Sequence, residues 1–313
     1  MHAVVIANGR LMWEERPDPE PAESELLVAV RAAGINAADL AQRRGVYPAP
    51  PGWPADIPGL EFAGEVVAAG QRVTRHAIGD DVLGLVGGGG QATLAIVDES
   101  HALPLPKGLP WPEAGGFAEA FFTAYDALIR QANLGLGERL LVTGASGGVG
   151  TAAVQLAAVA GAQVIAVARD AALRGPLTEL GAECVVTPDE IADHGPYDVV
   201  LELVGAPTLA SALAALALRG RVVVIGVGSG HRLELDLQWL MRARAVLRGS
   251  TMRARSRAEK AVVTGELERR LLPLLAAGRI RVPVSAAFPM AEAEAGYERF
   301  AQPGKLGKLV LVT

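Results

Sequence analysis

The fold is decided by the stretch Val142-Thr143-Gly144-Ala145-Ser146-Gly147-Gly148-Val149-Gly150. It ends a short apolar run at 140–143, a predicted buried strand, and opens a predicted helix over 149–160. A glycine-rich turn between a strand and a helix is the usual setting for the pyrophosphate of a dinucleotide. Gly147 and Gly150 provide the small residues that phosphate approach and helix–strand packing require, while Ala145 replaces the usual first glycine.

These features assign cofactor binding to five residues of the loop: Ser146, Gly147, Gly148, Val149 and Gly150. The N-terminus of the following helix offers N–H groups and the positive end of its dipole to the phosphates. The alternative is a glycine-rich turn that binds no ligand.

The residues after the next predicted strand, 164–167, indicate which dinucleotide binds. Enzymes that prefer NAD usually carry an acidic residue there, to accept hydrogen bonds from the adenosine ribose. Here Ala168 takes that place and Arg169 follows, and an arginine can pair with the 2′-phosphate of NADP. We therefore predict NADPH as the cofactor. Because Asp170 follows, NADH remains the less favoured alternative. Arg169 could also be a surface arginine that contacts only water and binds no phosphate.

Working outward, the chain alternates apolar strands with helices, which is typical of a parallel sheet covered on both faces. Further strands are predicted at 197–203, 221–225 and 245–247, and a helix at 113–131. The first hundred residues instead contain short strands, such as 26–30 and 64–67, and a proline-rich loop at 48–58. The last strand is predicted at 308–312.

The predicted architecture is α/β, a doubly wound Rossmann sheet inserted into a smaller β-rich domain. The β-rich substrate domain is expected over 1–116 and 256–313, and the dinucleotide-binding domain over 117–255. We expect the active site in the cleft between them, at the carboxyl ends of the parallel strands.

Composition excludes several classes of partner. A net charge of −5 and 4% aromatic residues argue against a nucleic-acid surface, and the basic stretch 242–260 is interpreted as a solvated face. Cys184 is the only cysteine, so neither an internal disulfide nor a cysteine zinc cage can form. No signal pattern or membrane span is evident. We expect a soluble cytoplasmic protein with neither nucleic-acid nor membrane partners.

In combination, these motifs resemble the medium-chain dehydrogenase/reductase superfamily, and within it the zeta-crystallin-type quinone oxidoreductases. The resemblance is carried by 34–40 with 44–47 and the proline loop, by 58–66, and by 119–125 with 144–150. It extends from Met1 to 307–310 and therefore covers essentially the whole chain. It implies that the β-rich domain is GroES-like.

The resemblance also implies a reaction without a metal. Zinc-dependent members hold a catalytic zinc with a cysteine and a histidine, and Asn36 and Leu60 stand at those two positions here. The four-cysteine lobe of a structural zinc is absent. Neither asparagine nor leucine replaces those ligands well. Quinones and α,β-unsaturated carbonyls fit this restriction, because their conjugation accepts hydride readily.

By resemblance, three residues lie at the nicotinamide end as candidate catalytic groups: Asn36, Asp39 and Tyr47. Tyr47 matches a tyrosine proton donor of related enoyl-thioester reductases, and a phenol can protonate or hydrogen-bond the anion left by hydride addition. The alternative for Tyr47 is a loop residue packed on Pro48 and Pro51. Asn36 either orients the substrate carbonyl or caps a turn.

The resemblance adds cofactor contacts beyond the loop: Thr123 at the nicotinamide ring, Gly226 and Val227 beside its carboxamide, and Ser250, Thr251 and Met252 flanking it. A tyrosine often found near the adenosine phosphate aligns with Pro188, which weakens the NADPH assignment.

We interpret the chain as an NADPH-dependent, zinc-free reductase of quinones or enones. It is expected to be a homodimer, joined through the edge strand near 245–249. Two other interpretations stay open: an enoyl-thioester reductase, as in polyketide synthesis, and a non-catalytic NADPH-binding sensor or structural protein.

Overall fold

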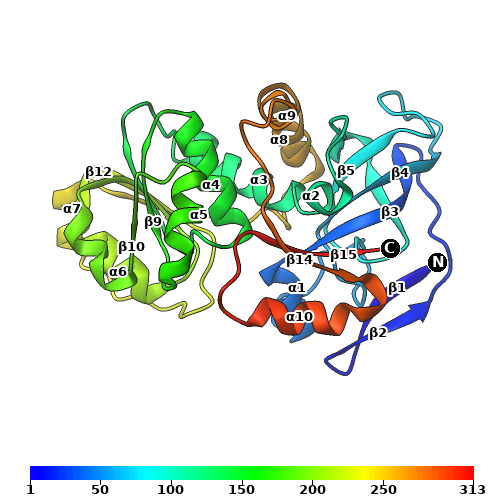
Figure 1. Cartoon of the computed structure of the whole chain (residues 1–313), viewed down its shortest axis with the longest axis horizontal. Helices are drawn as coiled ribbons and strands as arrows, with labels where there is room; N and C mark the ends of the chain where they lie inside the picture. The colour runs from blue at the N-terminus through cyan, green and yellow to red at the C-terminus, as the bar shows by residue number, and fades with distance from the viewer. The chain divides into compact units, whose positions relative to one another are not determined.

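The computed structural model describes all residues, 1–313, and they form two compact units. One unit combines Met1–Phe122 with Met252–Thr313, and the other is the continuous segment Thr123–Thr251. The predicted boundaries, at 116/117 and 255/256, lie a few residues from these. The second unit is thus inserted into the chain of the first, as Figure 1 shows by its colours.

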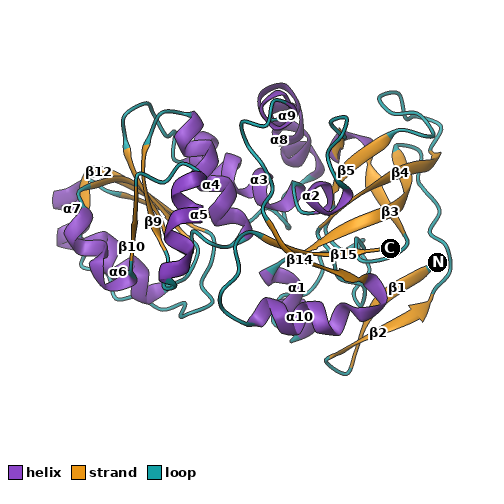
Figure 2. Cartoon of the chain, in the orientation of Figure 1, coloured by secondary structure: helices purple, strands orange, loops and turns teal.

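The first unit is built on a seven-stranded sheet with the order β14-β15-β3-β4-β5-β7, in which β6 also pairs with β3. Its long central strand β3 alternates buried and partly exposed residues over its first half, which indicates that one face lies on the core. A separate hairpin of β1 and β2 completes its strands, drawn in orange in Figure 2. The bounds are β1 His2–Ala7, β2 Arg10–Glu15, β3 Glu25–Ile35, β4 Glu61–Ala69, β5 Asp81–Leu85, β6 Leu94–Asp98, β7 Ala102–Pro104, β14 Val284–Pro289 and β15 Lys308–Val312.

Five helices accompany this sheet: α1 (Ala37–Arg43), α2 (Trp111–Gly115), α8 (Arg257–Arg270), α9 (Leu272–Ala276) and α10 (Ala293–Ala301). α10 packs on β14 and β15, and its Tyr297 joins the apolar core that includes Phe62 and Leu311. β3 ends at Ile35, and α1 follows after its N-cap residue Asn36. This direct strand-to-helix step brings the polar residues of α1 to the end of the sheet.

The second unit contains a six-stranded, all-parallel sheet with the order β10-β9-β8-β11-β12-β13, which confirms the predicted Rossmann-type sheet. The strands in the middle of the sheet are mostly apolar and buried, because helices cover both faces, and their charged residues lie near the strand ends. The bounds are β8 Arg139–Val142, β9 Gln163–Val167, β10 Cys184–Val186, β11 Tyr197–Glu202, β12 Leu216–Val224 and β13 Val246–Gly249.

Four helices of this unit connect the strands: α4 (Gly148–Val159), α5 (Arg174–Glu179), α6 (Ala206–Ala214) and α7 (Leu237–Ala243). Figure 1 shows α4 and α5 on one side of the sheet and α6 and α7 on the other. Leu209 and Leu213 of α6 pack with Leu141 and Val200 of the sheet. The order reverses between β8 and β11, where dinucleotides bind in such folds.

Two sequence predictions about local structure were wrong. The helix predicted over 113–131 is divided into α2, α3 (Ala118–Tyr125) and a π-helical turn over Asp126–Gln131. The break follows Gly115, where a Cβ would lie 2.6 Å from that of Ala32, and Gly116 ends α2. The basic stretch 242–260 is not uniformly solvated, because Arg253 and Lys260 are 4% and 3% exposed.

Candidate active site

The predicted cofactor loop has the geometry of a phosphate-binding turn. β8 ends at Val142, Gly144 adopts φ +58°, and α4 begins at Gly148 after its N-cap Gly147. A Cβ on Gly150 would lie 2.4 Å from the Gly144 carbonyl oxygen, so only glycine lets α4 approach the end of β8 so closely.

No side chain caps α4, and Ser146 to Val149 are partly exposed. The first N–H groups of a helix have no partner within it and bind anions readily. The five loop residues therefore fit the pyrophosphate of a dinucleotide.

At the end of β9, the structure separates the two residues that bear on NADPH and NADH. The Asp170 carboxylate accepts a hydrogen bond from the Ala172 N–H at 2.9 Å and caps a short turn. Arg169 is exposed two positions after the end of the strand. Asp170 is therefore engaged locally, whereas the Arg169 side chain faces solvent.

A buried carboxylate that sequence reasoning missed fixes the neighbouring strand ends. Glu202, at the end of β11, is 0% exposed, and its Oε1 accepts from the hydroxyls of Thr143 and Thr208 at 2.9 Å each. The same oxygen accepts from the N–H groups of Val204 and Gly205 at 2.7 Å. Glu202 thereby connects the end of β8, its own strand and the start of α6. An acidic residue at the end of an apolar strand was the available sequence signal.

The other predicted cofactor residues lie in different surroundings. Thr123 is 6% exposed, whereas Val227 is 48% exposed. A Cβ on Gly226 would lie 2.3 Å from the Leu203 carbonyl oxygen, which gives that glycine a packing reason of its own. The last three follow β13: Ser250, which accepts from Gln131 Nε2 at 2.5 Å; Thr251, which is exposed; and Met252, which is buried and belongs to the first unit.

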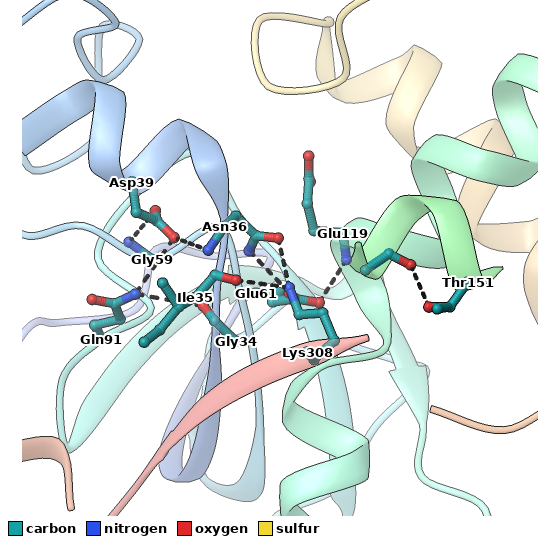
Figure 3. A network of polar contacts seen from close by, with 11 residues as sticks. Gly34, Ile35, Asn36, Asp39, Gly59, Glu61, Gln91, Glu119, Thr151 and Lys308 are labelled. Carbon is teal, nitrogen blue, oxygen red and sulfur yellow. Dashed lines mark hydrogen bonds and ion pairs between the residues drawn. The ribbon is translucent and has the colours of Figure 1, made fainter. Parts of the chain in front are cut away.

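In the first unit, a buried ion pair organises the substrate-side residues (Figure 3). Lys308 of β15 and Glu61 of β4 are 3% and 0% exposed, and their Nζ and Oε1 atoms are 2.6 Å apart. Lys308 also donates to the Ile35 carbonyl at 3.1 Å and to Asn36 Oδ1 at 2.6 Å. A Cβ on Gly34 would lie 2.2 Å from Glu61 Oε1, so the glycine makes room for the carboxylate.

Asn36 is held by this pair at both ends of its amide. Its Oδ1 accepts from Lys308, and its Nδ2 donates to Glu61 Oε1 at 2.9 Å. It also stands at the N-cap position of α1, where its backbone N–H donates to Asp39. One hydrogen of its amide remains beyond the Glu61 bond.

The contacts of Asp39 are those of a residue that positions the backbone around it. It is 0% exposed, and its carboxylate accepts from the backbone N–H of Asn36 at 2.8 Å and of Gly59 at 3.0 Å. Burial raises the pKa of Asp39 to about 6, although both N–H bonds act against the shift. These bonds connect α1 to the loop before β4 and leave the side chain away from the surface.

Tyr47 is held by Arg253, which sequence reasoning missed. The Arg253 guanidinium lies 5.2 Å from the centroid of the Tyr47 ring and donates to the Tyr47 carbonyl at 3.0 Å. It also donates to the Gly87 carbonyl at 2.8 Å and to Gln42 Oε1 at 2.5 Å. The ring is partly buried under a fixed cation, which is a more specific setting than packing on prolines.

Glu119, at the start of α3, is a further titratable group beside the ion pair. Its backbone N–H donates to Glu61 Oε2 at 2.8 Å. Burial and the neighbouring Glu61 carboxylate raise the pKa of Glu119 to about 8. Glu61, Glu119 and Lys308 all stood inside the motifs quoted above; the signal was a charged residue within an otherwise apolar segment.

The donor set does not fit a catalytic zinc at the two ligand positions. Both ends of the Asn36 amide are engaged by Lys308 and Glu61, and Leu60 is a buried hydrocarbon side chain without a donor atom. No cluster of three or more His, Cys, Asp or Glu side chains in the chain could hold a metal ion. Zinc independence stays a prediction.

None of the helices has both the length and the apolar character that crossing a membrane requires.

Two known families match separate parts of the chain. Residues 22–107 match the alcohol dehydrogenase GroES-like domain, and residues 148–265 match the family described as zinc-binding dehydrogenase. The chain is 32% identical over 303 residues to quinone oxidoreductase-like protein 2 homolog of Nematostella vectensis, which covers 93% of this chain and 82% of that protein.

Two further similarities have different coverage. The chain is 33% identical over 309 residues to a mycocerosic acid synthase-like polyketide synthase of Mycobacterium tuberculosis; this is 95% of the chain but only 14% of the synthase. A solved mycobacterial structure complexed with NADPH superposes with a TM-score of 0.90 at 25% sequence identity, covering 100% of both chains.

Proposed function

Because the chain belongs to the medium-chain dehydrogenase/reductase superfamily, we propose that it reduces quinones or α,β-unsaturated carbonyls with NADPH and without zinc. The superfamily makes it an oxidoreductase; the electrophile and the metal independence are the proposed part. The observation that carries the proposal is the contrast between an uncapped α4 N-terminus, suited to a dinucleotide, and substrate-side positions Asn36 and Leu60 without zinc ligands.

In this proposal, one set of residues binds the cofactor and another acts on the substrate carbonyl. Bound NADPH supplies the hydride, and the loop from Ser146 to Gly150 and Arg169 hold its phosphates. The Tyr47 hydroxyl donates to the oxygen that becomes anionic, and the remaining Asn36 amide hydrogen orients the same carbonyl. Lys308 and Glu61 keep the Asn36 amide in one orientation.

A screen of NADPH oxidation across ortho-quinones, para-quinones and enones tests the proposal. We expect turnover with at least one quinone or enone class and none with simple alcohols and NADP⁺, because an unactivated alcohol calls for strong alkoxide stabilisation. Elemental analysis belongs to the same experiment. Stoichiometric zinc that is lost together with activity on chelation would show that the metal assignment is wrong.

Enoyl thioesters are a second candidate substrate class, and the polyketide synthase relative favours them. An enoyl thioester is itself an activated α,β-unsaturated carbonyl, so the same residues serve both reactions. Comparing kcat/KM for an enoyl thioester with that for the matching free enone separates the two. A preference of tenfold or more for the thioester, about 1.4 kcal/mol, would assign the chain to thioester reduction.

A non-catalytic NADPH-binding protein is the alternative from another class. NADPH binding without turnover on every electrophile of the screen would support it and reject the proposed activity.

A further inference from the structure

Glu119 and Asn36 are brought together by a single carboxylate. The two oxygens of Glu61 accept from different partners: Oε1 from Asn36 Nδ2 at 2.9 Å and Oε2 from the Glu119 N–H at 2.8 Å. Lys308, 2.6 Å from Oε1, holds this carboxylate in place. Figure 3 shows the Glu119 side chain pointing away from the ion pair. The Asn36 side chain and the Glu119 backbone are therefore held by one carboxylate, and the Glu119 side chain begins beside this network.

Glu119 differs in exposure from its neighbours on α3. Ala118, Ala120 and Phe121 are each 1% exposed, whereas Glu119 is partly exposed. Glu119 is thus the one polar side chain in the first turn of α3, and it is partly exposed.

The charges around Glu119 favour its neutral form. Burial raises the pKa of Glu119 most, followed by the Glu61 carboxylate, and the value of about 8 leaves the group protonated at pH 7. Lys308 is paired with Glu61, and Lys260 donates to the Arg253 carbonyl at 2.9 Å; both lower the pKa of Glu119, but burial and the Glu61 carboxylate outweigh them. The charged groups that act on it come from four elements: Glu61 of β4, Asp39 of α1, Lys308 of β15 and Lys260 of α8; Arg253, just before α8, also interacts with it.

We propose that Glu119 is the general acid of the reduction and gives its carboxyl proton to the anion that hydride addition creates. The proposal rests on the proposed function, which supplies the hydride donor. The substrate gains a hydride, which is one proton with two electrons, from NADPH, which becomes NADP⁺. The O–H bond of Glu119 then breaks while a C–H or O–H bond of the product forms, and water returns a proton to the carboxylate. Tyr47 stabilises the same anion by hydrogen bonding and keeps its own proton.

The kinetic test compares Glu119→Gln with the unaltered protein across pH. In the unaltered protein, kcat/KM for an enone should fall about tenfold per pH unit above pH ~8, as the acid loses its proton. Glu119→Gln should lose roughly 10²–10⁴-fold in rate and should bind NADPH unchanged. Its kcat/KM should lack the alkaline limb, that is, the decrease above pH ~8. Glu113→Gln, on the preceding helix α2, is the matched control and should retain both rate and limb.

A second test follows the protonation of the Glu119 carboxyl through protein stability and requires no catalytic turnover. Between its ordinary pKa of 4.5 and about 8, the folded carboxyl keeps a proton that the unfolded chain has lost. The stability of the unaltered protein therefore contains a contribution that falls as pH rises through this window. Glu119→Gln does not titrate, so its melting temperature relative to the unaltered protein should rise from about pH 5 to pH 8.

The two tests separate failure of this inference from failure of the proposed function. If the unaltered protein reduces enones but Glu119→Gln retains the rate and the limb near pH 8, Glu119 is not the acid. A difference in melting temperature that is constant with pH also overturns the proposal, because the carboxyl would then be ionised at neutral pH. Absence of turnover with every quinone, enone and thioester rejects the proposed function and with it the catalytic role of Glu119.

Discussion

The predicted preference for NADPH over NADH depends on one side chain, that of Arg169. We expect Arg169→Ala to weaken NADPH binding roughly 10- to 150-fold, since a charge-assisted hydrogen bond to the 2′-phosphate contributes about 1.5–3 kcal/mol. NADH binding should change little, because NADH has no 2′-phosphate for the arginine to bind. Fluorescence titration with both cofactors measures the ratio.

Arg269→Ala, an exposed arginine on α8, is the matched control for charge alone. Equal losses for both cofactors, or no loss for either, would show that Arg169 does not bind the phosphate.

Tyr47 is expected to act through its hydroxyl group. Tyr47→Phe keeps the ring beneath Arg253 and removes only the donor, so the melting temperature should stay unchanged. Loss of one donor to a developing oxyanion typically costs about 10²–10³ in kcat. We expect that loss with enones and enoyl thioesters, and less than about tenfold with quinones, whose reduced anions are aromatic and weakly basic.

Steady-state rates on paired enone and quinone substrates check this expectation. The limb near pH 8 that we assign to Glu119 should persist in Tyr47→Phe. Rates equal to those of the unaltered protein on every substrate would reduce Tyr47 to a packing residue.

At the scale of elements, the Glu61–Lys308 pair connects β4 to β15 and should be a determinant of stability. Lys308→Met leaves the fully buried Glu61 carboxylate without its cation, and breaking a buried pair from one side costs about 3–5 kcal/mol. The free energy of unfolding in urea measures the loss. Lys107→Met, at an exposed position, is the control and should change it little.

The double variant Glu61→Gln/Lys308→Met should recover part of this stability, because no buried charge then remains unpaired. A single Lys308→Met variant as stable as the control would mean that water or another group compensates Glu61.

At the scale of the whole molecule, we propose a homodimer formed through the edge strand β13. The Rossmann-type sheet ends at β13, so one side of this strand has no neighbour within the chain. Exposed apolar residues lie on and near that edge: Leu218 (62%), Leu237 (67%), Met241 (76%) and Val246 (41%). Unpaired edges accept a further strand, and a two-fold axis there continues the sheet into a second copy.

Light scattering after size exclusion tests the dimer. The unaltered chain should have twice the mass of one chain, and Leu237→Glu/Met241→Glu should have the mass of one. Leu136→Glu, 85% exposed in the loop before β8, is the matched control and should remain dimeric. An unaltered protein with the mass of a single chain would contradict the proposal.

The sequence by itself determined the parallel sheet, the phosphate-binding turn and most strand positions of the second unit. These follow from local signals: apolar strands buried on both faces, and glycines such as Gly150 where a Cβ has no room. The helix expected over 113–131 was wrong, because the close approach of Gly115 to Ala32 comes from a distant strand.

Only the tertiary structure decided the polar network of the first unit. Asn36, Glu61, Glu119 and Lys308 come from four separate segments, up to 272 positions apart in the chain for the bond from Lys308 to Asn36. Their hydrogen bonds, and the raised pKa of Glu119, depend on which charges and how much burial the fold brings together. Arg253 lies in a basic stretch that looks solvated in sequence, yet it is buried, because backbone carbonyls from distant loops receive its guanidinium.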